Sequence, residues 1–206
     1  MTEDLPDKTE KIQLEGIIEE DKVIITDKNG IEEFYNTSYI GTIEKNSDGQ
    51  EFLSLGPIET LLLCERSRIL LWENNDKNKA IYDFENILTY FTQFDDRLWH
   101  KYIIYSDLRK RGYIVRTGYG NGIDFRVYKR GADFEKDSAK FLIFPVFEGD
   151  PIELRDLDMM SRVAMSSRKD LIVATVDRLS KPIYYSVKKF EILNIEENKG
   201  EERKDG

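Results

Sequence analysis

Residues 102–115 read YIIYSDLRKRGYIV, a stretch that holds the end of a helix and the start of a strand. The basic residues 109–111 suit the last turn of a helix, and Gly112 suits the left-handed position that ends one. One buried face is predicted by apolar residues at helical spacing: Leu98, Tyr102, Tyr105 and Leu108. A strand is expected at residues 113–115, so the chain passes from helix to strand without a long loop.

The part of the chain before this helix predicts a small α+β unit. Hydrophobic runs favour strands at residues 12–18, 23–26, 34–35, 39–43 and 69–72. Asp27–Gly30 is typical of a turn, and Pro57 suits the first position of a helix. Residues 74–79 are polar and form a candidate linker. We therefore expect a disordered N-terminus at residues 1–10 and an N-terminal α+β domain at residues 11–78.

The part of the chain around and after this helix predicts an α/β domain. Strands are expected at residues 123–128, 141–146, 171–176, 183–187 and 190–195. Asp83 is a candidate cap for one helix, and residues 152–167 have the spacing of another. The run at 171–176 is continuously apolar, which indicates a strand covered on both faces. We expect a C-terminal domain with a central mixed sheet at residues 79–195 and a disordered charged tail at residues 196–206.

Composition limits the function classes. The formal net charge of −9 argues mildly against a nucleic-acid partner, although a polyanion meets the local surface rather than the average. The chain has one cysteine, Cys64, and one histidine, His100, which excludes an internal disulfide and a cysteine-rich zinc site. No apolar stretch approaches the length of a membrane span, and residues 1–11 do not resemble a signal peptide. These features predict a soluble cytoplasmic protein.

Three phrases resemble those of the tRNA-intron endonuclease family and occur in the family's order. They are residues 102–115 above, GYGNGIDFRVYKRG at residues 118–131 and RVAMSSRK at residues 162–169. The resemblance extends over residues 12–195. It implies a restriction-endonuclease-like C-terminal domain and cleavage of precursor tRNA at a bulge–helix–bulge. The products would be a 2′,3′-cyclic phosphate and a 5′-hydroxyl, made without a metal or other cofactor because the nucleophile belongs to the RNA.

The family is described as using a tyrosine, a histidine and a lysine for this reaction. The tyrosine corresponds to Tyr128 and the lysine to Lys169, whereas Ser138 stands where the histidine is expected. Serine cannot act as a general acid near neutral pH as imidazole does, so its presence should lower the rate by about 10²–10⁴-fold. His100 corresponds to a position away from the expected site. The resemblance therefore implies an impaired active site.

The resemblance also implies two substrate-binding positions and an altered docking loop. Arg162 matches the family's arginine that grips a flipped bulge base, and Tyr184 falls where its stacking partner would lie. Each also has a plain interpretation, since Arg162 could be a cation on a helix surface and Tyr184 an ordinary sheet residue. The loop at residues 178–182 is basic, whereas the family docks its dimers through an acidic loop.

Three hypotheses follow for the function. In the first, the chain is the structural subunit of a heterotetramer, pairs with a catalytic chain and helps to hold precursor tRNA. In the second, it is an active homo-oligomeric endonuclease that uses Asp137 as the acid, or only Tyr128 and Lys169. In the third, it is an RNA-binding module or a metal-dependent nuclease, although the glutamate–lysine phrase usual in metal nucleases is missing.

Overall fold

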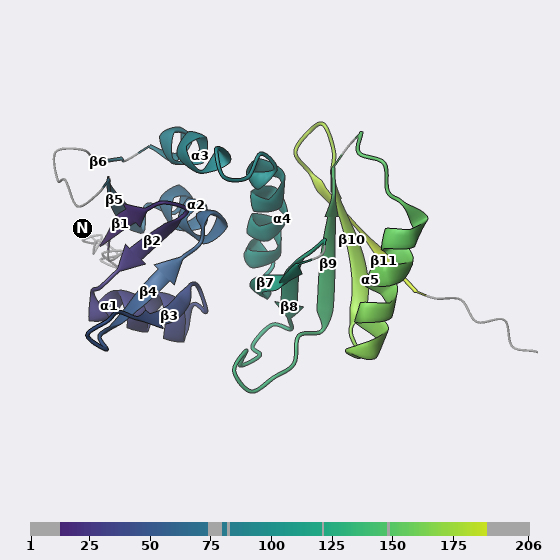
Figure 1. The fold of residues 1–206 in the computed structure, drawn as a ribbon, viewed down its shortest axis with the longest axis horizontal. Helices are drawn as coiled ribbons and strands as arrows, with labels where there is room; N and C mark the ends of the chain where they lie inside the picture. The colour runs from purple at the N-terminus through teal and green to yellow at the C-terminus, as the bar shows by residue number, and fades with distance from the viewer. Residues whose placement is uncertain (1–12, 74–79, 82, 121, 148, 189–206) are drawn as a thin grey trace, which may run out of the picture.

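The computed structural model describes residues 13–73, 80–81, 83–120, 122–147 and 149–188, which form two mixed sheets on either side of one helix, α4 (Figure 1). The first sheet has the strand order β3-β4-β2-β1-β5-β6, and the second has the order β11-β10-β9-β8-β7. The two-part α+β architecture with mixed sheets is as expected. The predicted disordered ends, the linker at residues 74–79 and the strand at residues 190–195 lie outside the described residues.

The first sheet belongs to the N-terminal part of the chain. Its strands are β1 Leu14–Glu19, β2 Lys22–Ile25, β3 Thr42–Lys45, β4 Glu51–Leu55, β5 Ile69–Glu73 and β6 Ala80–Ile81. Strands β1 and β5 are parallel and the other neighbours are antiparallel. Because β6 pairs with β5, the sheet continues past residue 78, although the division of the chain into domains there stays a prediction.

The sequence prediction was wrong between residues 27 and 41. The expected turn at Asp27–Gly30 is helix α1, Lys28–Gly30, and the expected strand at residues 34–35 lies in the π-helical η1, Ile31–Thr37. The Asp27 carboxylate accepts the amides of Asn29 and Gly30, so it caps a helix rather than shaping a turn. The next strand starts only at Thr42, because Tyr39 and Gly41 have positive φ angles of 55° and 82° that a strand does not allow.

The helices predicted at Pro57 and after Asp83 are confirmed. Helix α2, Pro57–Glu65, begins at its proline and buries Leu61, Leu62 and Leu63. Helix α3, Phe84–Thr92, is capped by Asp83, whose carboxylate accepts the Glu85 amide at 3.3 Å.

The second sheet contains all the expected C-terminal strands that fall in the described residues. They are β7 Ile114–Gly120, β8 Ile123–Tyr128, β9 Phe141–Val146, β10 Asp170–Val176 and β11 Pro182–Val187. Strands β9 and β10 are parallel, and helix α5, Leu154–Ser166, connects them. Helix α5 covers one face of this sheet through Met160 and Ala164, while α4 covers the other. The resemblance to a restriction endonuclease stays a prediction.

Helix α4, Leu98–Lys110, is buried on two sides. It contacts α2 and α3 of the first part and β7, β10 and β11 of the second. The predicted face is buried, and Ile104 and Ser106, which lie outside that face, are buried as well. A single hydrophobic core therefore runs from Leu14 in β1 to Val176 in β10. Among the described residues, no helix is both long and apolar enough to cross a membrane.

The shared core leads to a prediction about stability. We expect Ile104→Ala to lower the free energy of unfolding by about 2–5 kcal/mol, because the side chain is fully buried in the core that both parts share. Unfolding should stay a single transition by circular dichroism and by tryptophan fluorescence. The matched control is Met159→Ala on α5, where the side chain is 45% exposed and the change should stay within about 0.5 kcal/mol. Two separate transitions would contradict a shared core.

Candidate functional site

Two backbone hydrogen bonds bring the predicted catalytic positions to one edge of the second sheet. The Lys140 amide donates to the Val127 carbonyl at 2.8 Å, and the Asp170 amide donates to the Lys140 carbonyl at 3.1 Å. These bonds join the end of β8 to the starts of β9 and β10. Tyr128, Ser138 and Lys169 each lie within two residues of this path. In Figure 1 this is the lower edge of the sheet, where the loop from β8 to β9 projects.

Tyr128 ends β8 and is only 5% exposed. It lies in a small apolar cluster with Ile114 and Ala139, and its ring is 6.5 Å from that of Phe134, edge to face. Its neighbours hold the ring in place, so Tyr128 is a fixed part of the edge.

Ser138 lies in the loop between β8 and β9, with its side chain exposed to solvent. On one side of it, the Asp137 amide donates to the Asp133 carbonyl at 2.7 Å, and the Asp137 carboxylate accepts the Asp133 amide at 2.9 Å. On the other side, Ala139 is buried. Asp137, the alternative acid, is thus already engaged in closing the loop.

Lys169 follows helix α5, whose end has an unusual residue in the left-handed position. The Lys169 amide donates to the Ala164 carbonyl and the Arg168 amide to the Met165 carbonyl, which is the Schellman pattern of a helix end. Arg168 takes the place usually given to glycine, with a φ angle of 55°. The Lys169 ammonium donates to the Ser167 carbonyl at 3.0 Å, so the half-buried side chain lies back along the helix end.

His100 lies at the other end of the sheet. It lines a hollow with Val176 and Asp177 at the carboxyl end of β10, and its ring is 5.2 Å from Phe147. Because β10 is seven residues long, the two ends are separated by about 20 Å at ~3.3 Å per residue. The chain's histidine therefore cannot reach Tyr128 or Lys169 of its own sheet.

The structure does not bring Arg162 and Tyr184 together. Arg162 is exposed on α5 and pairs with Asp158 at 2.8 Å. Tyr184 pairs with Ala174 across β10 and β11 and lies on the other face of the sheet, against α4. Its hydroxyl donates to Asp107 at 2.8 Å, and burial together with this carboxylate raises the pKa of Tyr184.

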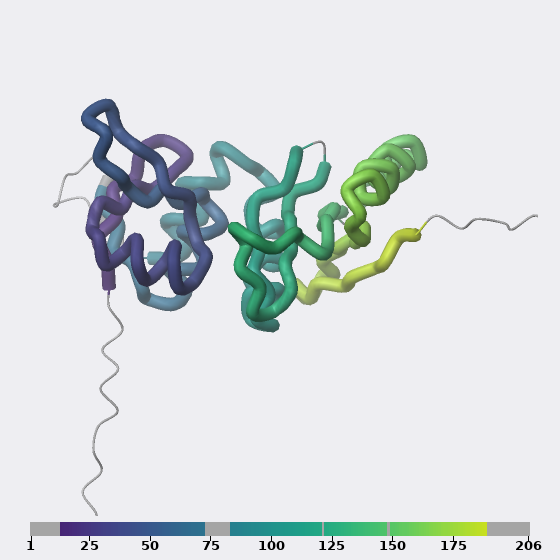
Figure 2. The backbone as a smooth tube through the Cα atoms, turned by 90° about the horizontal axis from the view of Figure 1, so that it is seen from below, coloured from purple at the N-terminus to yellow at the C-terminus, as the bar shows by residue number. Residues whose placement is uncertain are grey.

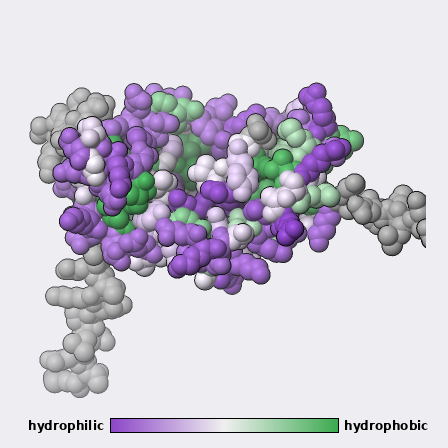
Figure 3. All heavy atoms as spheres, turned by 60° about the horizontal axis from the view of Figure 1, so that its bottom comes forward, coloured by the Kyte–Doolittle hydropathy of each residue, from purple (hydrophilic) through white to green (hydrophobic). Residues whose placement is uncertain are grey.

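The edge around the site is rich in cations, which the sequence alone did not indicate. They come from the ends of five elements that meet there: Lys110, Arg111, Lys129, Arg130, Lys140, Arg168, Lys169 and Lys188. Nearby Asp107 pairs with Arg111 at 2.8 Å and Asp170 with Lys140 at 3.1 Å. The loop tip adds Asp133, Glu135 and Asp137, which are bonded within the loop or to Tyr35. Figure 3 shows mostly hydrophilic side chains on the forward face and an apolar patch toward α5.

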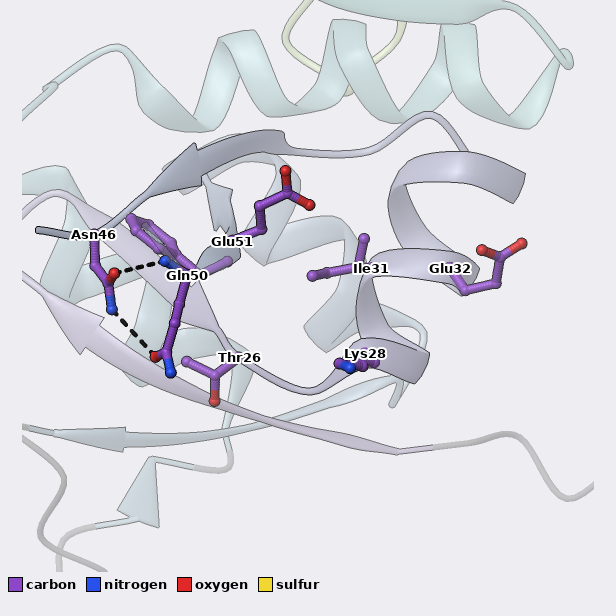
Figure 4. A pocket seen from close by; sticks show the side chains of 8 residues that line it. Thr26, Lys28, Ile31, Glu32, Asn46, Gln50 and Glu51 are labelled. Carbon is purple, nitrogen blue, oxygen red and sulfur yellow. Dashed lines mark hydrogen bonds between the residues drawn. The ribbon is translucent and has the colours of Figure 1, made fainter. Parts of the chain in front are cut away.

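Another hollow lies in the N-terminal part. Its volume is about 600 Å³, and it lies between η1 and the β3–β4 hairpin, where Asn46 and Gln50 bond to each other (Figure 4). It contains none of the predicted site residues. No group of three or more potential metal ligands occurs in the part of the chain that the structure describes, and a metal-free reaction stays a prediction.

Comparison with known proteins identifies two family matches. The tRNA intron endonuclease N-terminal domain matches residues 14–86, and the tRNA intron endonuclease catalytic C-terminal domain matches residues 98–185. A tRNA-splicing endonuclease of Methanococcus maripaludis is 35% identical over 170 residues, which are 82% of this chain and 90% of that protein. One from Thermococcus kodakarensis is 35% identical over 81% of this chain and 92% of its own length. One from Methanothermobacter thermautotrophicus is 30% identical, with 85% and 97% covered.

The geometry of the helix end before Lys169 leads to a second prediction, which concerns the free energy of unfolding. Arg168→Gly should raise the free energy of unfolding by about 0.5–1 kcal/mol, because glycine adopts the left-handed conformation without steric cost. The same change at Arg162, in the interior of α5, should lower it by about 1 kcal/mol. Thermal and urea unfolding of the two variants would check the opposite signs. Equal losses of stability would show that the Arg168 side chain stabilises the fold in another way.

Proposed function

The chain belongs to the tRNA-intron endonuclease family, and we propose that it is a non-catalytic subunit of a tRNA-splicing endonuclease. The assembled enzyme would cut precursor tRNA at bulge–helix–bulge sites and leave a 2′,3′-cyclic phosphate and a 5′-hydroxyl. A partner chain would supply the complete active site, in a heterotetramer. We also propose that the complex works in the cytoplasm.

The chemistry of cyclic-phosphate formation supports a non-catalytic role. A base must take the proton of the 2′-hydroxyl, an acid must protonate the leaving 5′-oxygen, and a cation must stabilise the charge on phosphorus. Tyr128 and Lys169 lie at the same end of the second sheet, and their residue types suit the base and the cation. Ser138 offers only a neutral hydroxyl, and the single histidine is about 20 Å away along the strands. The absence of a usable acid carries the proposal.

The cationic edge supports a role in holding RNA. Phosphate groups of RNA are bound by lysine and arginine side chains, and local charge matters more than the net −9 of the chain. Arg162 is exposed and suits stacking on an unpaired base. Tyr184 would first have to leave Asp107, so we propose that it contributes less to RNA binding than Arg162 does.

The second candidate function is an active enzyme built from copies of this chain. It is favoured by the location of Tyr128 and Lys169 at the same end of the second sheet, because these two residues alone could provide a slow reaction. An acid role for Asp137 is disfavoured by its hydrogen bond to the Asp133 amide. An RNA-binding module without any nuclease role is the remaining alternative.

The first test concerns the chain alone. We expect the purified protein to bind precursor tRNA with a bulge–helix–bulge but to leave it uncut in EDTA. Adding a second endonuclease chain with histidine at the matching position should start cleavage. Analysis of the RNA ends by gel electrophoresis would report the products. Cleavage to a cyclic phosphate by this chain alone would contradict the non-catalytic role, and a lack of binding in both mixtures would contradict subunit function.

The second test restores the acid. Ser138→His should raise the cleavage rate by about 10²–10⁴-fold over the parent chain. A histidine acid must be protonated to work, so the rate should fall as pH rises through its pKa, near 6.5 when unperturbed. Ser138→Asn is the matched control, because it adds a polar side chain that does not titrate. If Ser138→His leaves the rate unchanged, more than the acid is missing.

A further inference from the structure

One aromatic ring of the loop that carries Ser138 is held by four side chains. Phe134 meets Tyr35 and Tyr39 edge to face, with ring centres 5.7 and 5.3 Å apart. The Arg116 guanidinium lies 4.7 Å from the centre of the same ring. The Tyr128 ring is the fourth neighbour, with its centre 6.5 Å from that of Phe134. Edge-to-face and cation–ring contacts of this kind are attractive beyond the burial of area.

The side chains that contact Phe134 come from both parts of the molecule. Tyr35 belongs to η1 and Tyr39 follows it, whereas Arg116 is in β7 of the second sheet. Arg116 also donates to the Gly41 carbonyl at 2.5 Å, so it ties β7 to the chain after η1. The Tyr35 hydroxyl donates to the Glu135 carboxylate at 3.0 Å. Figure 2, viewed onto this edge, shows the loop lying between the two halves.

Tyr39 reaches the ring at a conformational cost. Its φ angle is 55°, which bulky side chains rarely adopt. Its amide donates to the Tyr35 carbonyl at 3.0 Å and the Ile40 amide to the Phe34 carbonyl at 2.7 Å, so the strain sits in a well-bonded helix end. Glycine would fit this position with less strain, but it would leave Phe134 without one wall.

The loop is closed by its own hydrogen bonds around Phe134. Asp133 and Asp137 bond to each other on either side of Phe134, and Ala139 is buried against Tyr128. Ser138 is therefore an exposed side chain on a backbone fixed from both directions. Rigid support of an exposed polar residue is what a binding or catalytic position requires.

We propose that Phe134 is a positioning residue: clasped by Tyr35 and Tyr39, it lets the N-terminal domain fix the backbone at residue 138. The geometry of the position where the family is described as having its histidine is thus set by the other domain of the same chain. This inference rests on the proposed function for its meaning in catalysis. The packing of Tyr35 and Tyr39 around Phe134, here called the clasp, is testable without RNA.

The mobility of residue 138 tests the clasp. Ser138→Cys is labelled with a nitroxide in a Cys64→Ala background, so that the label has a single thiol to react with. The native thiol is already a poor target, because burial raises the pKa of Cys64 to about 12. The electron paramagnetic resonance spectrum should show restricted motion. Adding Phe134→Ala should give a mobile spectrum and increase tryptic cleavage after Lys136 and Lys140 by about tenfold or more, while Phe134→Tyr should restore the restricted one.

Tyr39→Gly separates positioning from simple stability. It should leave the melting temperature unchanged or raise it, because the left-handed strain is removed, and still loosen the label at residue 138. An unchanged spectrum with Phe134→Ala or Tyr39→Gly would overturn the clasp. A loosened loop that accompanies a large fall in melting temperature in every variant would show general destabilisation and would overturn it too.

A kinetic measurement then connects the clasp to the reaction. In Ser138→His, adding Phe134→Ala should lower kcat by about tenfold or more and leave KM for the RNA nearly unchanged, with recovery by Phe134→Tyr. A loss of RNA binding as large as the loss in kcat would contradict a positioning role. If Ser138→His is inactive while the label still loosens, more than the acid is missing and the clasp stands. If the parent chain cleaves precursor tRNA alone, or does not bind it with or without a partner, while the label still loosens, the proposed function fails and the clasp stands. If Ser138→His is active and the label does not loosen, the clasp fails alone.

Discussion

The burial of helix α4 on both sides is the constraint on which the rest of the structure depends. Its outer neighbours α2 and α3 bring the first sheet against it, and its other side closes one face of the second sheet. With Ile104 and Ser106 buried as well as the predicted face, the helix has little surface left for solvent. The two parts therefore share a core, and their relative placement is set by packing rather than by a linker.

That placement has a consequence for the edge of the second sheet. Because β9 and β10 are parallel and joined by α5, their starts lie side by side, next to the end of the antiparallel β8. This topology collects Tyr128, the loop of Ser138 and Lys169 from distant points of the sequence. The shared core also brings η1 close enough for Tyr35 and Tyr39 to hold the loop. Fold and site are thus linked through the same helix.

Local sequence patterns predicted many of the helix ends and strands, and they failed where contacts between distant parts of the chain determine the structure. The stop at Gly112 and the strands of the second sheet follow from spacing and residue type, and both are confirmed. Ile104 was not among the residues of the predicted buried face, because a helical pattern indicates one face and not a second partner. Asp27 was assigned to a turn because capping and turn signals use the same residues. The placement of Arg162 and Tyr184 on opposite faces depends on the sheet topology, which motif spacing does not contain.

The three candidate positions differ in what the fold requires of them, and this bears on the proposal that the site is incomplete. The Tyr128 ring packs in a buried cluster, and the Lys169 amide completes the end of α5, so both contribute to the fold with or without chemistry. The Ser138 side chain is exposed, and its neighbours rather than itself hold the loop. Substitution of an exposed side chain without partners usually changes stability by less than about 0.5 kcal/mol. Residue 138 is therefore the position at which a catalytic group can be absent while the edge, its cations and its loop stay in place.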